Sequence, residues 1–222
     1  MKLRRVLGLV VAAQLFWIAA AFGQATYKAE VIGAASSTEI PKPVQESLAA
    51  QGTRVVDAQG TTLLEVWMPK TVATSATPSS GLGVTYGTLT EGTFLGVIHY
   101  PKPSSDFRGQ AIKAGFYTLR YSLIPQDGNH MGVFGTRDAI HLGPVSADTD
   151  VNKTLSYNDL IKLGRMVSGT PHPAFLVMEP ATGDDFPAVT KDDMGYWDLE
   201  VKAHGQSGEL PLAITVVGQW QG

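Results

Sequence analysis

The sequence contains no cysteine, and charged residues make up only 17% of its 222 residues. The absence of cysteine excludes disulfide bonds, a catalytic thiol and lipid attachment at a lipobox cysteine. A formal net charge of −3 gives the chain no basic surface, so we expect no nucleic-acid partner. The chain also contains no G-x-S-x-G nucleophile motif, no G-x-G-x-x-G loop and no P-loop. Composition and local motifs therefore identify no enzyme class.

The N-terminus has the layout of a secretory signal peptide. Three basic residues among the first five precede an uncharged apolar run at 6–22, and small residues flank the expected cleavage after Ala25. An uncleaved anchor is the alternative, because the apolar run approaches the length of a membrane span. An anchor, however, does not need small residues at a cleavage site. We therefore predict a signal peptide over 1–25 and a periplasmic or secreted protein that has no membrane contact after cleavage.

The rest of the chain consists of short β-rich runs separated by Gly, Pro, Asn and Asp. Residues 116–124, FYTLRYSLI, alternate between two faces, and residues 93–100, TFLGVIHY, are apolar on both faces. Helical spacing is confined to Pro43–Gly52 and Ser156–Gly169, each of which ends at a glycine. We therefore predict one all-β domain over 26–222, a mainly antiparallel β-sandwich or jelly-roll-like fold with two short helices.

Residues 71–87, TVATSATPSSGLGVTYG, are rich in Ser, Thr, Gly and Pro. This composition predicts a long mobile loop. A linker between two domains is the alternative, but residues 26–70 are too few to bury a core of their own. We therefore place the loop inside a single domain.

An Asp-Gly turn motif lies in the stretch SLIPQDGNHMGV, Ser122 to Val133, between two apolar runs. A two-residue loop pairs Pro125 with His130, whereas a three-residue loop pairs Gln126 with His130. A slip of one residue moves every side chain to the opposite face. The three-residue register separates apolar from polar side chains better and places His130 on a polar face with Arg120. We therefore predict the three-residue register.

This turn holds the candidate ligand-binding residues. They are Arg120, Gln126, Asp127, Asn129 and His130. In one interpretation Asp127 and Asn129 only form the turn, because such side chains bond to their own backbone. In the other, His130 contacts a ligand with Arg120 behind it.

A candidate calcium loop follows at 148–159, DTDVNKTLSYND. Positions 1, 3, 5, 7 and 12 of an EF-hand loop are occupied by Asp148, Asp150, Asn152, Thr154 and Asp159. Two departures weaken the match, since Lys153 replaces the glycine of the sharp turn and the last position lacks the usual glutamate. We expect a polar loop that caps the next helix and no cofactor, with calcium as the alternative. The histidines show no metal-binding spacing.

The stretch FRGQAIKAGFYTLRYSL contains the pattern A-G-x-Y-x-L. It resembles uncharacterised secreted bacterial proteins that are grouped as a domain-of-unknown-function family and carry this hairpin in a β-sandwich. The resemblance implies a fold and a compartment, but no established activity and no catalytic residue.

Two functions stay open on the sequence alone. The first is a non-enzymatic extracytoplasmic module that binds a small ligand or a partner in the cell envelope. The second is an extracytoplasmic hydrolase or lyase with its site near the turn at 125–130. The missing catalytic motifs favour the module.

Overall fold

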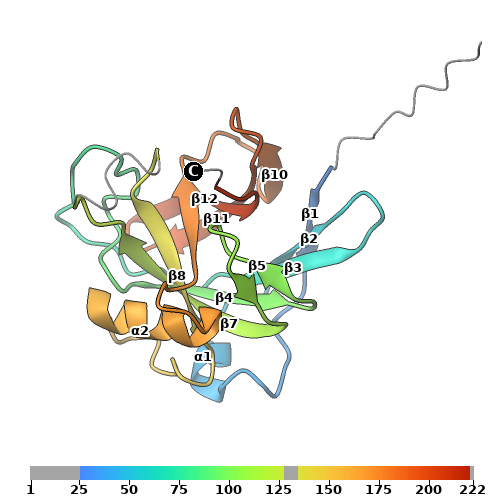
Figure 1. The fold of residues 1–222 in the computed structure, drawn as a ribbon, viewed down its shortest axis with the longest axis horizontal. Coiled ribbons are helices and arrows are strands. Elements are labelled where there is room, and N and C mark those ends of the chain that lie inside the picture. Colours follow the sequence, from blue (N-terminus) through green and yellow to red (C-terminus); the bar gives the residue numbers. More distant parts are fainter. Residues whose placement is uncertain (1–25, 128–134, 221–222) are drawn as a thin grey trace, which may run out of the picture.

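The structure is a computed structural model that describes residues 26–127 and 135–220. These ranges form twelve strands and two helices, and Figure 1 shows how they are arranged. In chain order they are β1 Lys28–Ile32, α1 Lys42–Ser47, β2 Gly52–Val56, β3 Thr62–Trp67, β4 Phe94–Tyr100, β5 Ser104–Ser105, β6 Ala111–Ile112, β7 Gly115–Leu123, β8 Asp138–Pro144, α2 Tyr157–Ser168, β9 Phe175–Glu179, β10 Ala188–Lys191, β11 Trp197–Gly205 and β12 Gly208–Val217. Neither helix has the length and apolar character needed to cross a membrane.

Ten strands form one antiparallel sheet in the order β1-β2-β3-β4-β7-β8-β9-β12-β11-β10, and β5 pairs with β6 in a separate hairpin. Most neighbours follow one another in the chain, as in a meander. The sheet curls until its edge strands β1 and β10 come into contact. Next to β1, Tyr27 packs edge-on against Trp197, with 5.2 Å between the two ring centroids. The predicted all-β, mainly antiparallel class with two helices is confirmed, and the two layers of the sandwich are parts of one nearly closed sheet.

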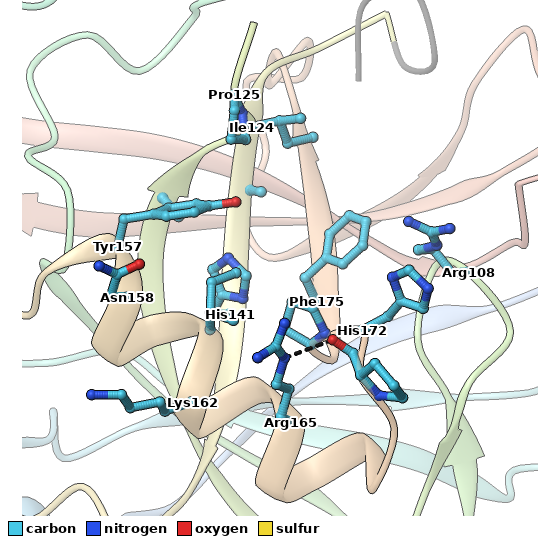
Figure 2. A pocket seen from close by; sticks show the side chains of 15 residues that line it. Arg108, Ile124, Pro125, His141, Tyr157, Asn158, Lys162, Arg165, His172 and Phe175 are labelled. Carbon is cyan, nitrogen blue, oxygen red and sulfur yellow. Dashed lines mark hydrogen bonds between the residues drawn. The ribbon is translucent and has the colours of Figure 1, made fainter. Parts of the chain in front are cut away.

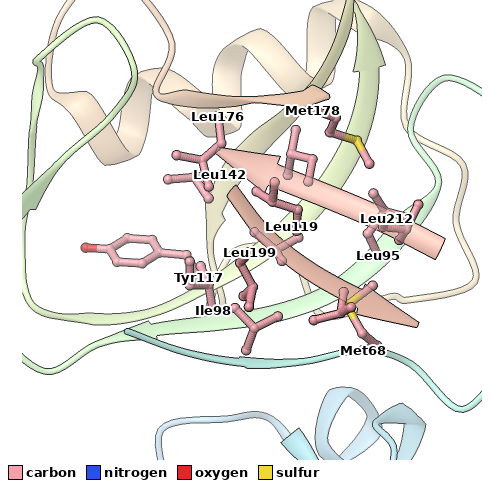
Figure 3. Packing of buried hydrophobic residues seen from close by; sticks show 14 of the residues in the cluster. Met68, Leu95, Ile98, Tyr117, Leu119, Leu142, Leu176, Met178, Leu199 and Leu212 are labelled. Carbon is pink, nitrogen blue, oxygen red and sulfur yellow. The ribbon is translucent and has the colours of Figure 1, made fainter. Parts of the chain in front are cut away.

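The main hydrophobic core lies inside this curl. Leu119 of β7 lies opposite Leu142 of β8, and both are fully buried. Side chains from β4, β11 and β12 join the same cluster, among them Ile98, Leu199 and Leu212 (Figure 3). Alternation along the strands therefore directs one face of each strand into a shared interior.

The outer face of β7 and β8 is also covered, which the sequence did not predict. Helix α2 lies along β8, and a Cβ atom on Gly143 would lie only 3.3 Å from Leu163 of that helix. Consequently Thr118, Arg120 and Ser122 are buried, although their polarity suggested a solvated face. A strand with both faces covered needs partners for its polar groups, and the covering segments supply them.

Helix α2 begins and ends as its sequence predicts. The Ser156 hydroxyl accepts a hydrogen bond from the Asp159 N–H, and Gly169 closes the helix with a φ of 66°. Helix α1 has Pro43 in its first turn, as predicted, but it ends at Ser47 because Leu48 is extended and pairs with Pro69. The N-cap and C-cap preferences therefore fix the bounds of the longer helix.

The predicted three-residue turn includes residues outside the described ranges, but the strand register that it implies for β7 is wrong. That register requires Leu123 opposite Val133, whereas the structure places Leu123 opposite Asp138 and Tyr121 opposite Ile140. The two-residue alternative fails for the same reason. The connection therefore runs from residue 124 to residue 137, and a local Asp-Gly motif inside it does not set the register of the strands.

The loop at 71–87 is attached to the sheet at its C-terminal end. Tyr86 is buried, and its hydroxyl donates to the Glu179 carbonyl while it accepts from the Ala213 N–H. The Asp138 carboxylate accepts hydrogen bonds from the backbone N–H groups of Thr85 and Tyr86. The N-terminal end is held as well, since Val72 is buried and pairs with Gly205. Mobility of the loop stays a prediction.

Candidate ligand-binding site

A cavity of about 710 Å³ lies between α2, β8 and the segment that leads into β9. Its floor is formed by Ala139, His141 and Phe175, and α2 contributes Tyr157 and Ile161 to one wall. Figure 2 shows Tyr157 on the helix and His141 and Phe175 on the side of the strands. The volume falls within the range of small-molecule sites, which are mostly apolar with a few convergent polar groups.

The cavity is cationic although the chain as a whole is acidic. Three of its lining residues carry a positive charge, Arg108, Lys162 and Arg165, and His172 lies beside Arg108 in Figure 2. None of the described residues that line it is Asp or Glu, whereas the formal net charge of the chain is −3. Like charges repel, so a cluster of cationic side chains is unfavourable unless a bound anion neutralises it or solvent screens it.

The nearest carboxylates are engaged elsewhere or lie at the margin. Asp159 lies 3.6 Å from the Lys162 ammonium, and this ion pair weakens the attraction of the lysine for an anionic ligand. Glu91 accepts from the Ser122 hydroxyl at 2.6 Å and from the Leu123 N–H at 3.1 Å. The two arginines are therefore the cations that the cavity offers most fully to an anion.

A buried carboxylate holds Arg108 in place. Asp106 is fully buried and accepts hydrogen bonds from the backbone N–H groups of Arg108 and Gln110 and from the Gln110 amide. Burial raises the pKa of Asp106, and these hydrogen bonds oppose the rise. The Asx turn that results directs the next residues toward the cavity, so Arg108 is presented by a structured turn.

Close packing fixes the opposite wall. The Arg165 Nε donates to the Pro171 carbonyl at 2.6 Å, shown as a dashed line in Figure 2. A Cβ atom on Gly164 would lie 2.5 Å from the Pro173 side chain, so only glycine permits this approach of α2. The 171–173 segment and the helix therefore form one unit that positions Arg165.

His141 lies deep in the cavity and is only 6% exposed. Its ring centroid lies 6.3 Å from that of Tyr157 and 6.3 Å from that of Phe175. Burial lowers the pKa of His141 to about 4, so the imidazole is neutral at pH 7. Its Nδ1 is the only buried side-chain nitrogen or oxygen without a hydrogen-bond partner in 26–127 and 135–220.

The hydroxyl groups of Ser122 and Tyr157 also line the cavity. The Ser122 hydroxyl is directed at the Glu91 carboxylate. Burial raises the pKa of Tyr157, and the charges of Glu91 and Asp127 raise it further, so the phenol is neutral at pH 7. The arrangement suits recognition of a ligand, because the charged arginines and the neutral histidine and phenol can each bind a different part of it.

The structure separates the residues that the sequence grouped at the turn. Arg120 is 1% exposed and its guanidinium binds Asp148, so it is not free to support a ligand contact as the sequence predicted. Gln126 and Asp127 are exposed at the margin of the cavity. Asn129 and His130 lie outside the described residues, and their role stays a prediction.

The candidate calcium loop surrounds a guanidinium. Both Asp148 oxygens accept from Arg120, from Nε and Nη2 at 2.7 Å each. Arg120 also donates to the backbone carbonyls of Asp150, Lys153 and Gly92. Asn152 and Thr154 are exposed. Ser156, inside the loop, caps α2 by accepting a hydrogen bond from the Asp159 N–H, as the sequence predicted.

A calcium site needs Asp148 as its first ligand, and here both oxygens of that carboxylate bind a cation of the protein itself. Within the described ranges no three His, Cys, Asp or Glu side chains are grouped so that they could hold a metal ion. Calcium binding stays a prediction.

Comparison with family models, curated proteins and solved structures finds no match to this chain. The assignment of the site therefore rests on its geometry. Sequence reasoning missed the site because Arg108, His141, Arg165 and His172 are far apart in the chain and share no motif. The one local sign was the Pro-His-Pro segment at 171–173, which predicts a rigid turn that holds its histidine outward.

Proposed function

We propose that the protein is a ligand-binding module that takes a small organic anion into the cavity between α2 and β8. The observation that carries the proposal is the placement of Arg108 and Arg165 around a largely apolar cavity whose described lining contains no carboxylate. Guanidinium groups bind carboxylate, phosphate and sulfate groups in a bidentate manner, more specifically than ammonium groups do.

The apolar lining defines the rest of the ligand. Ile161 and Phe175, together with the neighbouring prolines, offer surface to a hydrocarbon chain or ring. An inorganic anion would leave this surface unused. The favoured ligand is therefore an amphipathic acid whose charged group lies on the arginines and whose body lies against the aromatic floor.

Calorimetric titration with three ligands of matched size tests the proposal. We expect 3-phenylpropanoate to bind, and 3-phenylpropylamine and 3-phenylpropanamide to bind at least about tenfold more weakly, a difference of about 1.4 kcal/mol. A phenylalkyl phosphate and a phenylalkyl sulfonate in the same series distinguish the kind of anion.

Arg108→Gln and Arg165→Gln should each weaken binding of the acid by about tenfold or more. Arg54→Gln is the matched control, because it removes the same charge from β2, where Arg54 forms an exposed ion pair with Glu30 of β1. Equal binding of acid and amine, or equal losses in the control and the cavity variants, would contradict the proposal.

The extracytoplasmic location belongs to the same proposal and is supported by the composition of residues 1–25. A ligand-binding module outside the cytoplasm fits a chain without catalytic motifs. The alternative hydrolase or lyase centred on His130 depends on residues outside the described ranges and stays a prediction.

A further inference from the structure

We propose that His141 binds a hydroxyl group on the apolar end of the ligand, so that the ligand is a hydroxylated organic acid, with a hydroxyaryl carboxylate as the best-fitting class. This inference rests on the proposed function, since it adds a second recognition point to the same cavity. It deepens that proposal by naming which acids the cavity prefers.

The first step is the state of the histidine nitrogen. His141 is nine-tenths buried on the cavity floor, and its Nδ1 has no hydrogen-bond partner among the described residues. Buried polar groups in folded proteins nearly always have a partner, because an unpaired one is destabilising. The residue lines the cavity, but Nδ1 itself is covered, so a molecule within the cavity supplies that partner when the imidazole ring turns toward it.

The second step is the chemistry of that partner. A neutral imidazole offers one donor and one acceptor, and it does not attract a negative charge as an arginine does. The low pKa of His141 keeps it neutral at pH 7. An uncharged hydroxyl both donates and accepts, so it satisfies Nδ1 in either tautomer.

The third step is the shape of the ligand. Tyr157 and Phe175 flank the His141 ring with centroids 6.3 Å away, so the polar nitrogen lies between two aromatic side chains. Arg108 and Arg165 enter the cavity from other segments, the 106–110 turn and α2. A ligand that reaches both groups therefore carries its acid and its hydroxyl on opposite ends of an apolar body, as a 4-hydroxyphenyl acid does.

The test compares pairs of ligands that differ only in the hydroxyl. We would titrate the protein with 4-hydroxyphenyl acids of increasing chain length and with the matching phenyl acids. In the best-fitting pair the hydroxyl should increase affinity about fivefold, the gain expected from one hydrogen bond. In His141→Phe the preference should fall to within about twofold, while the phenyl acid keeps its affinity.

His204→Phe is the control, because His204 is exposed on β11. It should retain the full preference for the hydroxyl. A second readout uses the unmodified protein and covers the case in which His141→Phe does not fold. The ¹⁵N shift of His141 Nδ1 should change with the hydroxylated ligand and stay nearly constant with the phenyl analogue.

A water molecule can also satisfy Nδ1, and the hydroxyl then brings no gain in affinity. A preference below about twofold in every pair, or one that persists in His141→Phe, would overturn this inference. Binding of the phenyl acids would be unaffected in that case, so the proposed anion site would stand. Failure of every acid to bind would overturn both.

Discussion

At the scale of single residues, Arg120 shows how burial changes the meaning of a charged side chain. The sequence suggested a residue on a polar face that supports a ligand contact of His130, but the guanidinium is buried against Asp148 and three backbone carbonyls. It also lies 5.2 Å from the centre of the Phe94 ring. Its role is to anchor the 148–155 segment against the outer face of β7.

Asp148→Asn should therefore be strongly destabilising, by roughly 3–5 kcal/mol, because it leaves a buried guanidinium without its counter-charge. Asp150→Asn is the matched control and should cost under about 1 kcal/mol, since Arg120 binds only its backbone carbonyl. Urea unfolding measures both. If calcium raises the melting temperature and Asp150→Asn abolishes the rise, the loop is a metal site and the guanidinium account is wrong.

Glu179 provides a test by pH. Burial raises its pKa from 4.5 to about 7, and the carboxylates of Asp198, Asp192 and Asp138 add to the rise. The folded state therefore retains a proton between pH 4.5 and 7 that the unfolded state has released. The stability contributed by this group is full below pH 4.5 and is lost as the pH rises through 7.

Glu179→Gln should remove that dependence and should stabilise the protein at pH 8 by about 1 kcal/mol, a value reduced for solvent screening of a partly exposed group. Urea unfolding at several pH values measures it, with exposed Glu39→Gln as control. If the free energy of unfolding depends on pH between 4.5 and 7 in Glu179→Gln as it does in the unmodified protein, the Glu179 carboxyl does not have a raised pKa.

At the scale of elements, local patterns predicted α2 well and the turn after β7 poorly. Ser156 and Gly169 are cap residues whose effect depends on their immediate neighbours, and they mark the helix bounds correctly. The pairing of β7 with β8 depends instead on contacts between distant strands. An Asp-Gly motif inside a long connection therefore gave a register that the structure does not have.

The same distinction explains why the cavity could not be predicted. Its lining residues come from the 106–110 turn, the end of β7, β8, α2 and the 171–175 segment, and only the packing of α2 on the sheet unites them. Burial of the outer face of β7 also depends on a segment that is distant in the chain, residues 148–153, which bind Arg120. The alternation in residues 116–124 predicted a strand, but it did not reveal what covers the polar face.

Gly164 tests the packing of α2. Alanine at a helix interior is favoured over glycine by about 1 kcal/mol, but here its Cβ would lie 2.5 Å from Pro173. We therefore expect Gly164→Ala to lower the free energy of unfolding by roughly 1–3 kcal/mol. Met166→Ala, at a side chain that is 60% exposed, should change it by less than about 0.5 kcal/mol. If Gly164→Ala instead stabilises the protein, the 171–173 segment moves to accommodate the added methyl group and does not hold α2 at a fixed distance.

At the scale of the whole molecule, the nearly closed sheet holds the outer face of β7 and β8 in place, and the candidate site is built on that face. The core inside the curl fixes β7 and β8, and α2 then encloses the cavity against them. Binding sites commonly lie where a helix meets a rigid sheet in this way. On the proposed function, the cationic cavity of an otherwise acidic chain would favour small anions at this one place.

Export is also a property of the whole chain. We expect the mature protein to begin near Thr26 and to be found outside the cytoplasm. Intact mass of protein recovered from the periplasm or the medium measures the cleavage site. Exported material that retains residues 1–25 would indicate an uncleaved anchor.

The central claim is that the cavity beneath α2 binds an organic anion, and mapping the site by NMR tests it most directly. On titration with 3-(4-hydroxyphenyl)propanoate, the account predicts saturable changes in the backbone amide signals of Ala139, His141, Ile161 and Phe175. Signals near the smaller cavities, around Thr62 and Phe186, should stay unchanged. Changes confined to those cavities, or no saturable change in any signal, would contradict the account.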